Sequence, residues 1–305
     1  MSELPIYYDS TMNSTFKACP RKFYWNFIRN KVPLGESIHL VAGGAYAAAL
    51  HAARTAQFTG MKGMPEDRKL TVDELMESCL PAFLEAWGDY QAPEGHAKSK
   101  HNMLYALEQY FERYHPSDDV IQPLAKEDGT PATEFSFAIP VPVNHPTTGE
   151  PFLYCGRFDM LGTYADRVTV MDDKTTGYFV QNWEKMWMMR GQFLGYVWAC
   201  QQMGHVTNDC LVRGCAIQKT QIKFLDCPIT YPQHLIDRWY EELLMTLNHL
   251  VACYKNDDWG YNFADSCSSY GGCPYMDLCV VGDAERFMNN YQDRTWSPIK
   301  LEETL

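Results

Sequence analysis

Helical and strand-like hydrophobic patterns divide the chain into three regions. Residues 1–130 are mainly helical in pattern. One helix is expected in "STFKACPRKFYWNFIRNKV" and a second in "GGAYAAALHAARTAQF", which is rich in alanine, the best helix former. Thr71 and Glu74 form a capping-box pattern for a helix over 72–90, and another helix is expected over 98–114.

Strand-like patterns dominate residues 131–230. The runs "ATEFSFAIPVPV", "PFLYCGRFDMLGTY" and "RVTVMDDKTT" predict three consecutive strands. A long helix is expected in "WEKMWMMRGQFLGYVWACQQMG", followed by strands in "CLVRGCAIQ" and "IKFLDCPIT". A helix over 232–255 and a cysteine-bearing tail make up the third region, residues 231–305.

This order of elements predicts an α/β (α+β) fold. Strands lie in the middle of the chain, helices precede and follow them, and one helix lies between strands, which indicates a central mixed β-sheet with flanking helices. No linker separates two independent parts, so residues 1–305 are expected to form a single domain. No apolar run is long enough to span a bilayer, so no membrane partner is expected.

The polar residues "YADR", 164–167, lie between two of the predicted strands and indicate a hairpin turn. A loop of four residues and a loop of two residues both pair positions whose numbers sum to 331. Either register therefore places Asp159 directly opposite Asp172. Because side chains alternate along a strand, Lys174 shares the face of Asp172, and Asp173 points away.

Two opposed carboxylates raise the question of a metal ion. Their Cβ atoms are expected roughly 5 Å apart, where like charges are destabilising. A divalent cation between Asp159 and Asp172 removes that penalty, and Mg²⁺ or Mn²⁺ suits carboxylate ligands. Such an ion activates water at a scissile phosphate, with Lys174 orienting the water or balancing charge. A solvated hairpin end with an ordinary Asp–Lys pair is the alternative, and the opposing Asp159 favours the metal site.

The run "GRFDMLG" followed by "VTVMDDKTT" resembles the PD-(D/E)XK nuclease superfamily, in its RecB-like branch. Asp159, Asp172 and Lys174 match the family's acidic residue, second acid and lysine one for one. The resemblance implies a restriction-endonuclease-like core over residues 131–230 and metal-dependent hydrolysis of DNA phosphodiester bonds. It also implies that the backbone carbonyl of Asp173 is a metal ligand.

Further residues match the family less closely. Gln192 and Tyr196 resemble its Gln-x-x-x-Tyr pair and share one helix face, although ordinary helix packing explains that spacing too. The family usually has a metal-binding histidine where the closest register of "GGAYAAALHAAR" places Ala47. His51 lies one helical turn later, so either His51 is the ligand or the site lacks a histidine. Glu134, on the first strand, is a further candidate.

The cysteines suggest a second metal centre. There are 11 of them and no export signal, which favours a reducing compartment, and a cytoplasmic location is expected. Cys267, Cys273 and Cys279 are so close in sequence that they indicate a metal or iron–sulfur site. RecB-like nucleases with an iron–sulfur cluster are similar, and the resemblance implies a [4Fe–4S] cluster on these three residues and Cys19. Zn²⁺ is the alternative, because the tail lacks the family's usual CxxC.

Charge and motifs limit the partners. The net charge of −12 argues against a general nucleic-acid coat protein, but the N-terminal segment is locally basic. Its aromatic residues Phe23, Tyr24 and Trp25 could stack on the bases of a single strand or could pack in the core. No phosphate-binding loop of an ATP-driven motor is present, so the substrate is expected to be single-stranded DNA or duplex ends, or a helicase or recombination protein unwinds it.

Taken together, these patterns predict a Mg²⁺- or Mn²⁺-dependent deoxyribonuclease. By resemblance it is an exonuclease of DNA recombination, repair or processing, with a phage origin and a host-cytoplasmic location as one setting. The rival interpretation is a non-catalytic DNA-binding module with a structural iron–sulfur or zinc site. The presence of Asp159, Asp172 and Lys174 together favours the enzyme.

Overall fold

The computed structural model describes residues 3–63, 69–263, 265–268, 272–281 and 284–299. The chain divides into two compact units, and each consists of more than one segment. Unit 1 contains Met1–Gly35, Ser136–Arg157 and Gln233–Leu305, and unit 2 contains Glu36–Phe135 and Phe158–Pro232. No helix among the described residues is long and apolar enough to cross a membrane.

A mixed seven-stranded sheet is the central element, as the sequence predicts. Its main path runs β1-β5-β6-β7-β8, and β3 and β4 also pair with β5. Neighbours β5–β6 and β7–β8 are antiparallel, whereas β1–β5 and β6–β7 are parallel. The strands are β1 (Tyr7–Tyr8), β3 (Ile121–Pro123), β4 (Thr133–Asn144), β5 (Pro151–Tyr164), β6 (Arg167–Thr176), β7 (Asp209–Ile217) and β8 (Ile222–Thr230).

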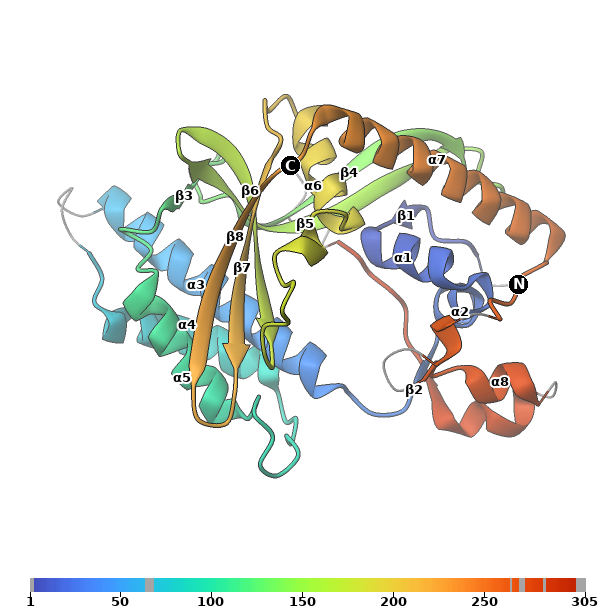
Figure 1. Ribbon diagram of the computed structural model, residues 1–305, viewed down its shortest axis with the longest axis horizontal. Coiled ribbons are helices and arrows are strands. Elements are labelled where there is room, and N and C mark those ends of the chain that lie inside the picture. Colours follow the sequence, from blue (N-terminus) through green and yellow to red (C-terminus); the bar gives the residue numbers. More distant parts are fainter. Residues whose placement is uncertain (1–2, 64–68, 264, 269–271, 282–283, 300–305) are drawn as a thin grey trace. The chain divides into compact units, whose positions relative to one another are not determined.

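Three helices of unit 2 form one core with β7 and β8 (Figure 1). They are α3 (Ile38–Gly63), α4 (Val72–Trp87) and α5 (Lys100–Arg113). Buried alanines recur along α3 at positions 42, 45, 49 and 53, so its backbone can approach its neighbours closely. The capping box of Thr71 and Glu74 is present at the start of α4.

The long helix expected from Trp183 onward is wrong in its first third. The α-helix α6 begins at Gly191 and ends at Gln202, and Lys185–Trp187 form only a short 3-10 turn before it. Arg190 has an extended backbone, with φ −80° and ψ 114°. Tertiary packing overrides helix propensity here, because Trp183 and Trp187 are buried.

In unit 1 the expected N-terminal helix is also divided. Helix α1 (Ser10–Ala18) stops before Cys19, which has an extended backbone, and α2 (Pro20–Phe23) continues into a π-helical turn (Tyr24–Ile28). The physical reason is Pro20, whose ring disfavours helical backbone angles in the preceding residue.

The remaining elements of unit 1 come from both ends of the chain. Helix α7 (Gln233–Asn256) packs on α1, and the ring centroids of Phe16 and His249 lie 5.2 Å apart. Helix α8 spans Met276–Val280. A separate two-stranded sheet pairs β2 (Lys31–Pro33) with β9 (Tyr291–Asp293), two strands too short for the hydrophobic pattern to predict.

Candidate active site

The β5–β6 hairpin sets the geometry of the predicted acidic residues. Its turn has two residues, Ala165 and Asp166, both with positive φ, as the twist of tight hairpins requires. Paired residues run from Tyr164–Arg167 to Met160–Met171, and every pair sums to 331. The register is the expected one, and Asp159 and Asp172 are the next residues beyond its last pair.

Five of the predicted residues make contacts with one another at this point. The Asp173 N–H donates to Asp159 Oδ2 over 2.8 Å. Lys174 Nζ lies 2.5 Å from Asp172 Oδ1, so this lysine and this acid share a face of β6. Gln192 Nε2 donates to Asp172 Oδ2 over 3.3 Å. The strand pair and the start of α6 therefore meet at Asp172, which is 1% exposed.

Helix α6 also contributes Tyr196 and Phe193 to this group of side chains. The same amide nitrogen donates to the Tyr196 hydroxyl over 3.2 Å, so the Gln-x-x-x-Tyr spacing places both side chains together on one helix face. The Phe193 ring centroid lies 5.6 Å from Lys174 Nζ, within the range of a cation–π contact. The first turns of α6 thus pack directly on the acid–lysine group.

Burial and charge act together on the titratable groups. Burial raises the pKa of Asp159, and the nearby charges of Asp172 and Glu134 raise it further. Burial also raises the pKa of Asp172, and Lys174 opposes that change only in part. Burial alone would lower the pKa of Lys174, but attraction by Asp172 and Asp159 gives a net rise. A bound cation would oppose the rise in the pKa values of these acids, because it favours their charged forms.

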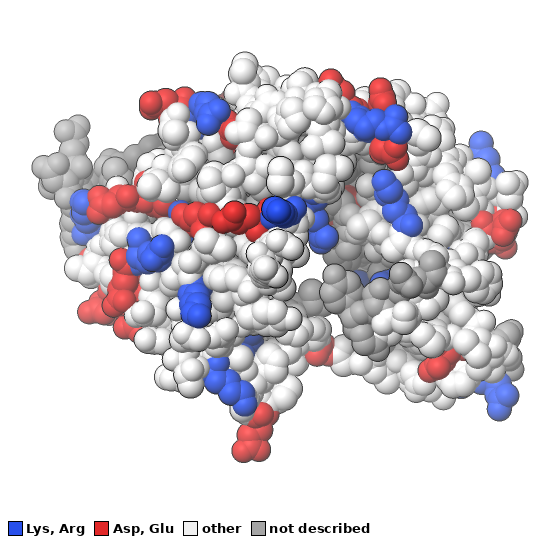
Figure 2. All heavy atoms as spheres, viewed as in Figure 1, with Lys and Arg blue, Asp and Glu red and all other residues white. Residues whose placement is uncertain are grey.

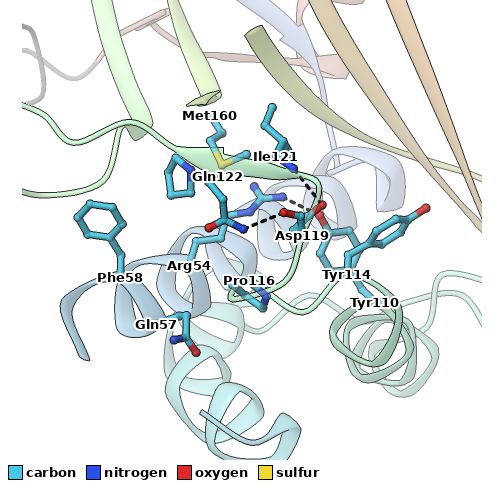
Figure 3. Close-up of a pocket in the computed structure, with 11 residues that line it drawn as sticks. Arg54, Gln57, Phe58, Tyr110, Tyr114, Pro116, Asp119, Ile121, Gln122 and Met160 are labelled. Atoms are coloured by element: carbon cyan, nitrogen blue, oxygen red, sulfur yellow. Dashed lines mark hydrogen bonds between the residues drawn. The ribbon is translucent and has the colours of Figure 1, made fainter. Parts of the chain in front are cut away.

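Asp173 points to the opposite face of β6, as alternation predicts. Arg54 Nη2 lies 2.7 Å from Asp173 Oδ2, and the Tyr110 hydroxyl donates to Asp173 Oδ1 over 3.2 Å. Arg54 and Arg213 both donate to that hydroxyl, over 2.7 and 3.0 Å. Figure 3 shows Arg54 and Tyr110 beside Asp119, which forms two hydrogen bonds with Arg213.

No local pattern in the sequence indicated this buried network. Arg54 belongs to α3, Tyr110 to α5 and Arg213 to β7, and all three are separated from Asp173 by long stretches of chain. A buried arginine needs paired carboxylates, but hydrophobic patterning does not tell which ones. These residues hold Asp173 from behind the acid pair.

The start of β4 lies beside the same site. Glu134 has φ +48°, a left-handed conformation that non-glycine residues rarely adopt and that often marks functional sites. Its charge acts on Asp159, so the two carboxylates are neighbours. His51 Nδ1 lies 2.8 Å from the hydroxyl of Thr133, the residue before Glu134. The role of His51 as a metal ligand stays a prediction.

Arg190 is a site residue that sequence analysis missed. It precedes the first residue of α6 and is exposed. Its positive charge lowers the pKa values of both Asp172 and Lys174, which places it close to them. The expected long helix put this arginine in mid-helix and so concealed it.

Most of the chain matches a known protein family. Residues 11–280 match the family model of the PD-(D/E)XK nuclease superfamily. The chain belongs to that superfamily. Its members are usually nucleases that hydrolyse phosphodiester bonds, and they typically use Mg²⁺ or Mn²⁺. One similar solved structure, "Crystal structure of SSO0001", has 13% identity and a TM-score of 0.31, and the match covers 75% of this chain and 94% of that one. No curated protein matches.

Unit 1 of this PD-(D/E)XK protein brings the four predicted cysteines into one neighbourhood. Asn262 Nδ2 donates to the Ala18 carbonyl over 2.6 Å, which ties the tail to the residue before Cys19. The Cys273 N–H donates to the Cys267 carbonyl over 2.8 Å. Segments far apart in sequence therefore meet where the N-terminal helix is divided.

Burial and nearby charges act on the pKa of the Cys279 thiol. Burial raises the pKa of Cys279; Arg21 opposes the rise, and Cys273, Cys19 and Cys267 add to it. Across the described ranges, however, no group of three or more His, Cys, Asp or Glu side chains is arranged to hold a metal ion. The four thiols are neighbours, then, but they do not form a closed ligand set.

The N-terminal segment packs inward rather than presenting stacked rings. Phe23 and Trp25 are 0% and 3% exposed, which favours the core alternative for these aromatic residues. Lys31 forms an ion pair with Asp293 over 2.6 Å. On the face drawn in Figure 2, acidic and basic side chains are interspersed.

Proposed function

We propose that this protein is a metal-dependent deoxyribonuclease. Superfamily membership supports phosphodiester hydrolysis. The observation that carries the site assignment is the meeting of Asp159, Asp172 and Lys174 through the β6 backbone and the Asp172–Lys174 ion pair. Hydrolysis of a phosphodiester needs groups that hold a metal ion and stabilise charge, and an acid pair beside one ammonium group can supply both.

The acid pair fits a hard divalent cation. Asp172 Oδ1 is buried and contacts Lys174, yet it accepts no hydrogen bond of good geometry from any described residue. Carboxylate oxygens of this kind suit Mg²⁺ or Mn²⁺. Asp159, Asp172 and the backbone carbonyl of Asp173 would hold the ion, with His51 as a further proposed ligand. The ion would stabilise charge on the scissile phosphate and lower the pKa of a bound water.

Other side chains have supporting roles in this proposal. Lys174, which is 30% exposed while Asp172 is almost fully buried, orients the attacking water or balances phosphate charge. Gln192 fixes the second oxygen of Asp172 and the Tyr196 hydroxyl. Arg190 is exposed beside them and is suited to bind a phosphate oxygen.

We also propose that Cys19, Cys267, Cys273 and Cys279 hold a [4Fe–4S] cluster, with Zn²⁺ as the alternative. The donor set supports this, because four thiolates are the ligands of both centres. The mutual effect of these thiols on the pKa of Cys279 supports it too. The RecB-like branch, an exonuclease mode and a role in recombination, repair or processing rest on the sequence resemblance.

The decisive experiment is a cleavage assay with purified protein, Mn²⁺ and end-labelled single-stranded and duplex DNA. The wild-type protein is expected to cleave, and EDTA is expected to stop it. Asp172→Ala and Lys174→Ala should each abolish cleavage while the protein remains folded. Asp166→Asn is the matched control, because this exposed acid lies in the same hairpin and its left-handed backbone suits asparagine. Undiminished cleavage by either site variant would overturn the assignment.

A further inference from the structure

The segment between β6 and α6, residues 177–190, exposes an unusual number of apolar side chains. They are Tyr178 at 64%, Val180 at 43%, Met186 at 46%, Met188 at 55% and Met189 at 72% exposure. We call these five residues the apolar platform. All five belong to this one segment of chain, and exposed apolar side chains that are gathered together mark interaction sites.

A row of packed aromatic rings, which we call the aromatic ladder, anchors the segment that carries the platform. Ring centroids lie 5.0 Å apart for Phe179–Trp183, 4.8 Å for Trp183–Trp187 and 5.6 Å for Trp187–Phe193. Gly214 of β7 makes room for the ladder, since a Cβ there would lie 2.6 Å from the Phe179 ring. The exposed side chains therefore stand on a packed base.

The ladder ends at the candidate active site. Its last ring, Phe193, lies 5.6 Å from Lys174 Nζ. The segment itself starts three residues after Lys174 and ends at Arg190, the residue before the first residue of α6. A ligand held at the acid pair thus has the platform as its neighbour on the same segment of chain.

We propose that the apolar platform binds unpaired nucleobases of the DNA strand whose phosphate lies at the acid pair. This inference rests on the proposed nuclease function and names its substrate as DNA with single-stranded character next to the cleaved bond. In a duplex the base faces are covered by one another, so only unpaired bases can rest on tyrosine and methionine side chains. Methionine sulfur contacts aromatic rings favourably and adapts to different shapes, which suits binding without sequence preference.

Charge on the same segment agrees with a nucleic-acid occupant. Lys185 and Arg190 are exposed on this segment, against one exposed acid, Glu184, so its net charge is positive and the two cations can pair with backbone phosphates. A groove that combines cations with side chains for base contact is the general means of binding single strands.

The test separates base contacts from phosphate contacts. Binding is measured in EDTA, by fluorescence anisotropy, with a labelled thymidine strand of about 16 nucleotides and an abasic strand of equal length and charge. Wild-type protein is expected to bind the thymidine strand about 5-fold to 100-fold more tightly than the abasic strand, the range that base stacking supplies. The double variant Met188→Ser/Met189→Ser should lose most of that preference, and so should Tyr178→Ala.

Matched controls use exposed residues of the same types elsewhere. Met245→Ser, at a methionine of α7 that is 61% exposed, and Tyr105→Ala, at a tyrosine of α5 that is 46% exposed, should keep the wild-type preference. Thermal melting checks that every variant is folded. Equal wild-type affinity for both strands, or an unchanged preference in the platform variants, would overturn the platform. Failure of the wild type to cleave any DNA with Mn²⁺ would instead overturn the nuclease function, since the binding comparison needs no catalysis.

Discussion

At the scale of single residues, Asp173 joins the two faces of β6. Its N–H donates to Asp159 on one side, and its carboxylate is bound by Arg54 and Tyr110 on the other. Any shift of that carboxylate moves the peptide group that contacts Asp159. Arg54 is therefore a positioning residue, because it acts on the acid pair through Asp173.

Loss of Arg54 is expected to destabilise the protein strongly. The Arg54 and Asp173 side chains are 7% and 3% exposed, so Arg54→Ala leaves a buried carboxylate without its cation. The free energy of unfolding should fall by about 3–5 kcal/mol, as measured by urea denaturation. Lys69→Ala is the control, because it breaks an ion pair with Asp118 that is more than half exposed and should cost far less stability. Equal losses in the two variants would contradict this account.

His51 provides a second prediction at this scale. His51 is a proposed metal ligand and lies next to Thr133. The variant His51→Ala should therefore raise the Mn²⁺ concentration for half-maximal cleavage about 10-fold to 100-fold. Excess Mn²⁺ should partly restore the rate. His101→Ala, at an exposed histidine of α5, should leave the titration unchanged. A wild-type titration curve for His51→Ala would give the histidine a structural role.

The residues that sequence predicts well are those whose placement depends on local rules. The period of two along a strand and the sum of paired positions placed Asp159, Asp172 and Lys174 together without further information. Arg54 and Tyr110 could not be predicted, because their contacts with Asp173 depend on how α3 and α5 pack on the sheet. Patterning fixes which side of a helix is buried, but not its partner across the core.

At the scale of elements, the same limit explains the correction between β6 and α6. Helical spacing extends through "WEKMWMM", so the sequence predicts a continuous helix. The aromatic ladder instead packs Trp183 and Trp187 into the core beside Gly214, and the helix starts only at Gly191. Tertiary packing of two tryptophans outweighs the few tenths of a kcal/mol per residue that helix propensity provides.

The start of α1 yields a prediction about pH. Asp9 caps this helix by accepting from the Met12 N–H over 2.7 Å, and it also accepts from Trp296 Nε1 over 3.2 Å. Burial raises its pKa to about 6. The folded state therefore binds more protons than the unfolded state between about pH 4 and pH 6, and stability should fall as pH rises through that window.

Asp9→Asn tests this linkage by removing the titration while keeping a carbonyl oxygen at the cap. From pH 4 to pH 6, the free energy of unfolding should fall by up to about 3 kcal/mol more in the wild type than in Asp9→Asn. The titratable neighbours Tyr8 and Cys155 stay neutral over this window, because burial raises the pKa of each. Parallel pH profiles for the two proteins would show that Asp9 titrates normally.

At the scale of the whole molecule, the proposed active site and the proposed metal centre on the cysteines belong to different compact units. Unit 2 carries the acid pair, and unit 1 carries the four cysteines. The expectation of a single domain over residues 1–305 stays a prediction. Unit 1 is assembled from three stretches of chain, so a metal centre on Cys19 and the tail would hold together segments that loop closure makes costly to join.

The proposed cluster has a visible signature. Anaerobically purified protein should be brown, and Cys19→Ala or Cys273→Ala should lose the colour and much of the thermal stability. Cys200→Ala, at a buried thiol of α6, and Asp172→Ala should both keep the colour. Colourless protein with one equivalent of zinc would replace the cluster with a structural zinc site. Full metal content in Cys19→Ala would show that the fourth ligand lies elsewhere.

The discontinuous make-up of unit 1 has a consequence for how the chain is made. Translation delivers all of unit 2 by Pro232, whereas Cys19 emerges early and has to wait for Cys267 and the residues beyond it. Metal loading on the four proposed ligands would then follow translation. A ribosome stalled after Pro232 would carry a nascent chain with every acidic residue of the proposed active site and only one of its four proposed cluster ligands.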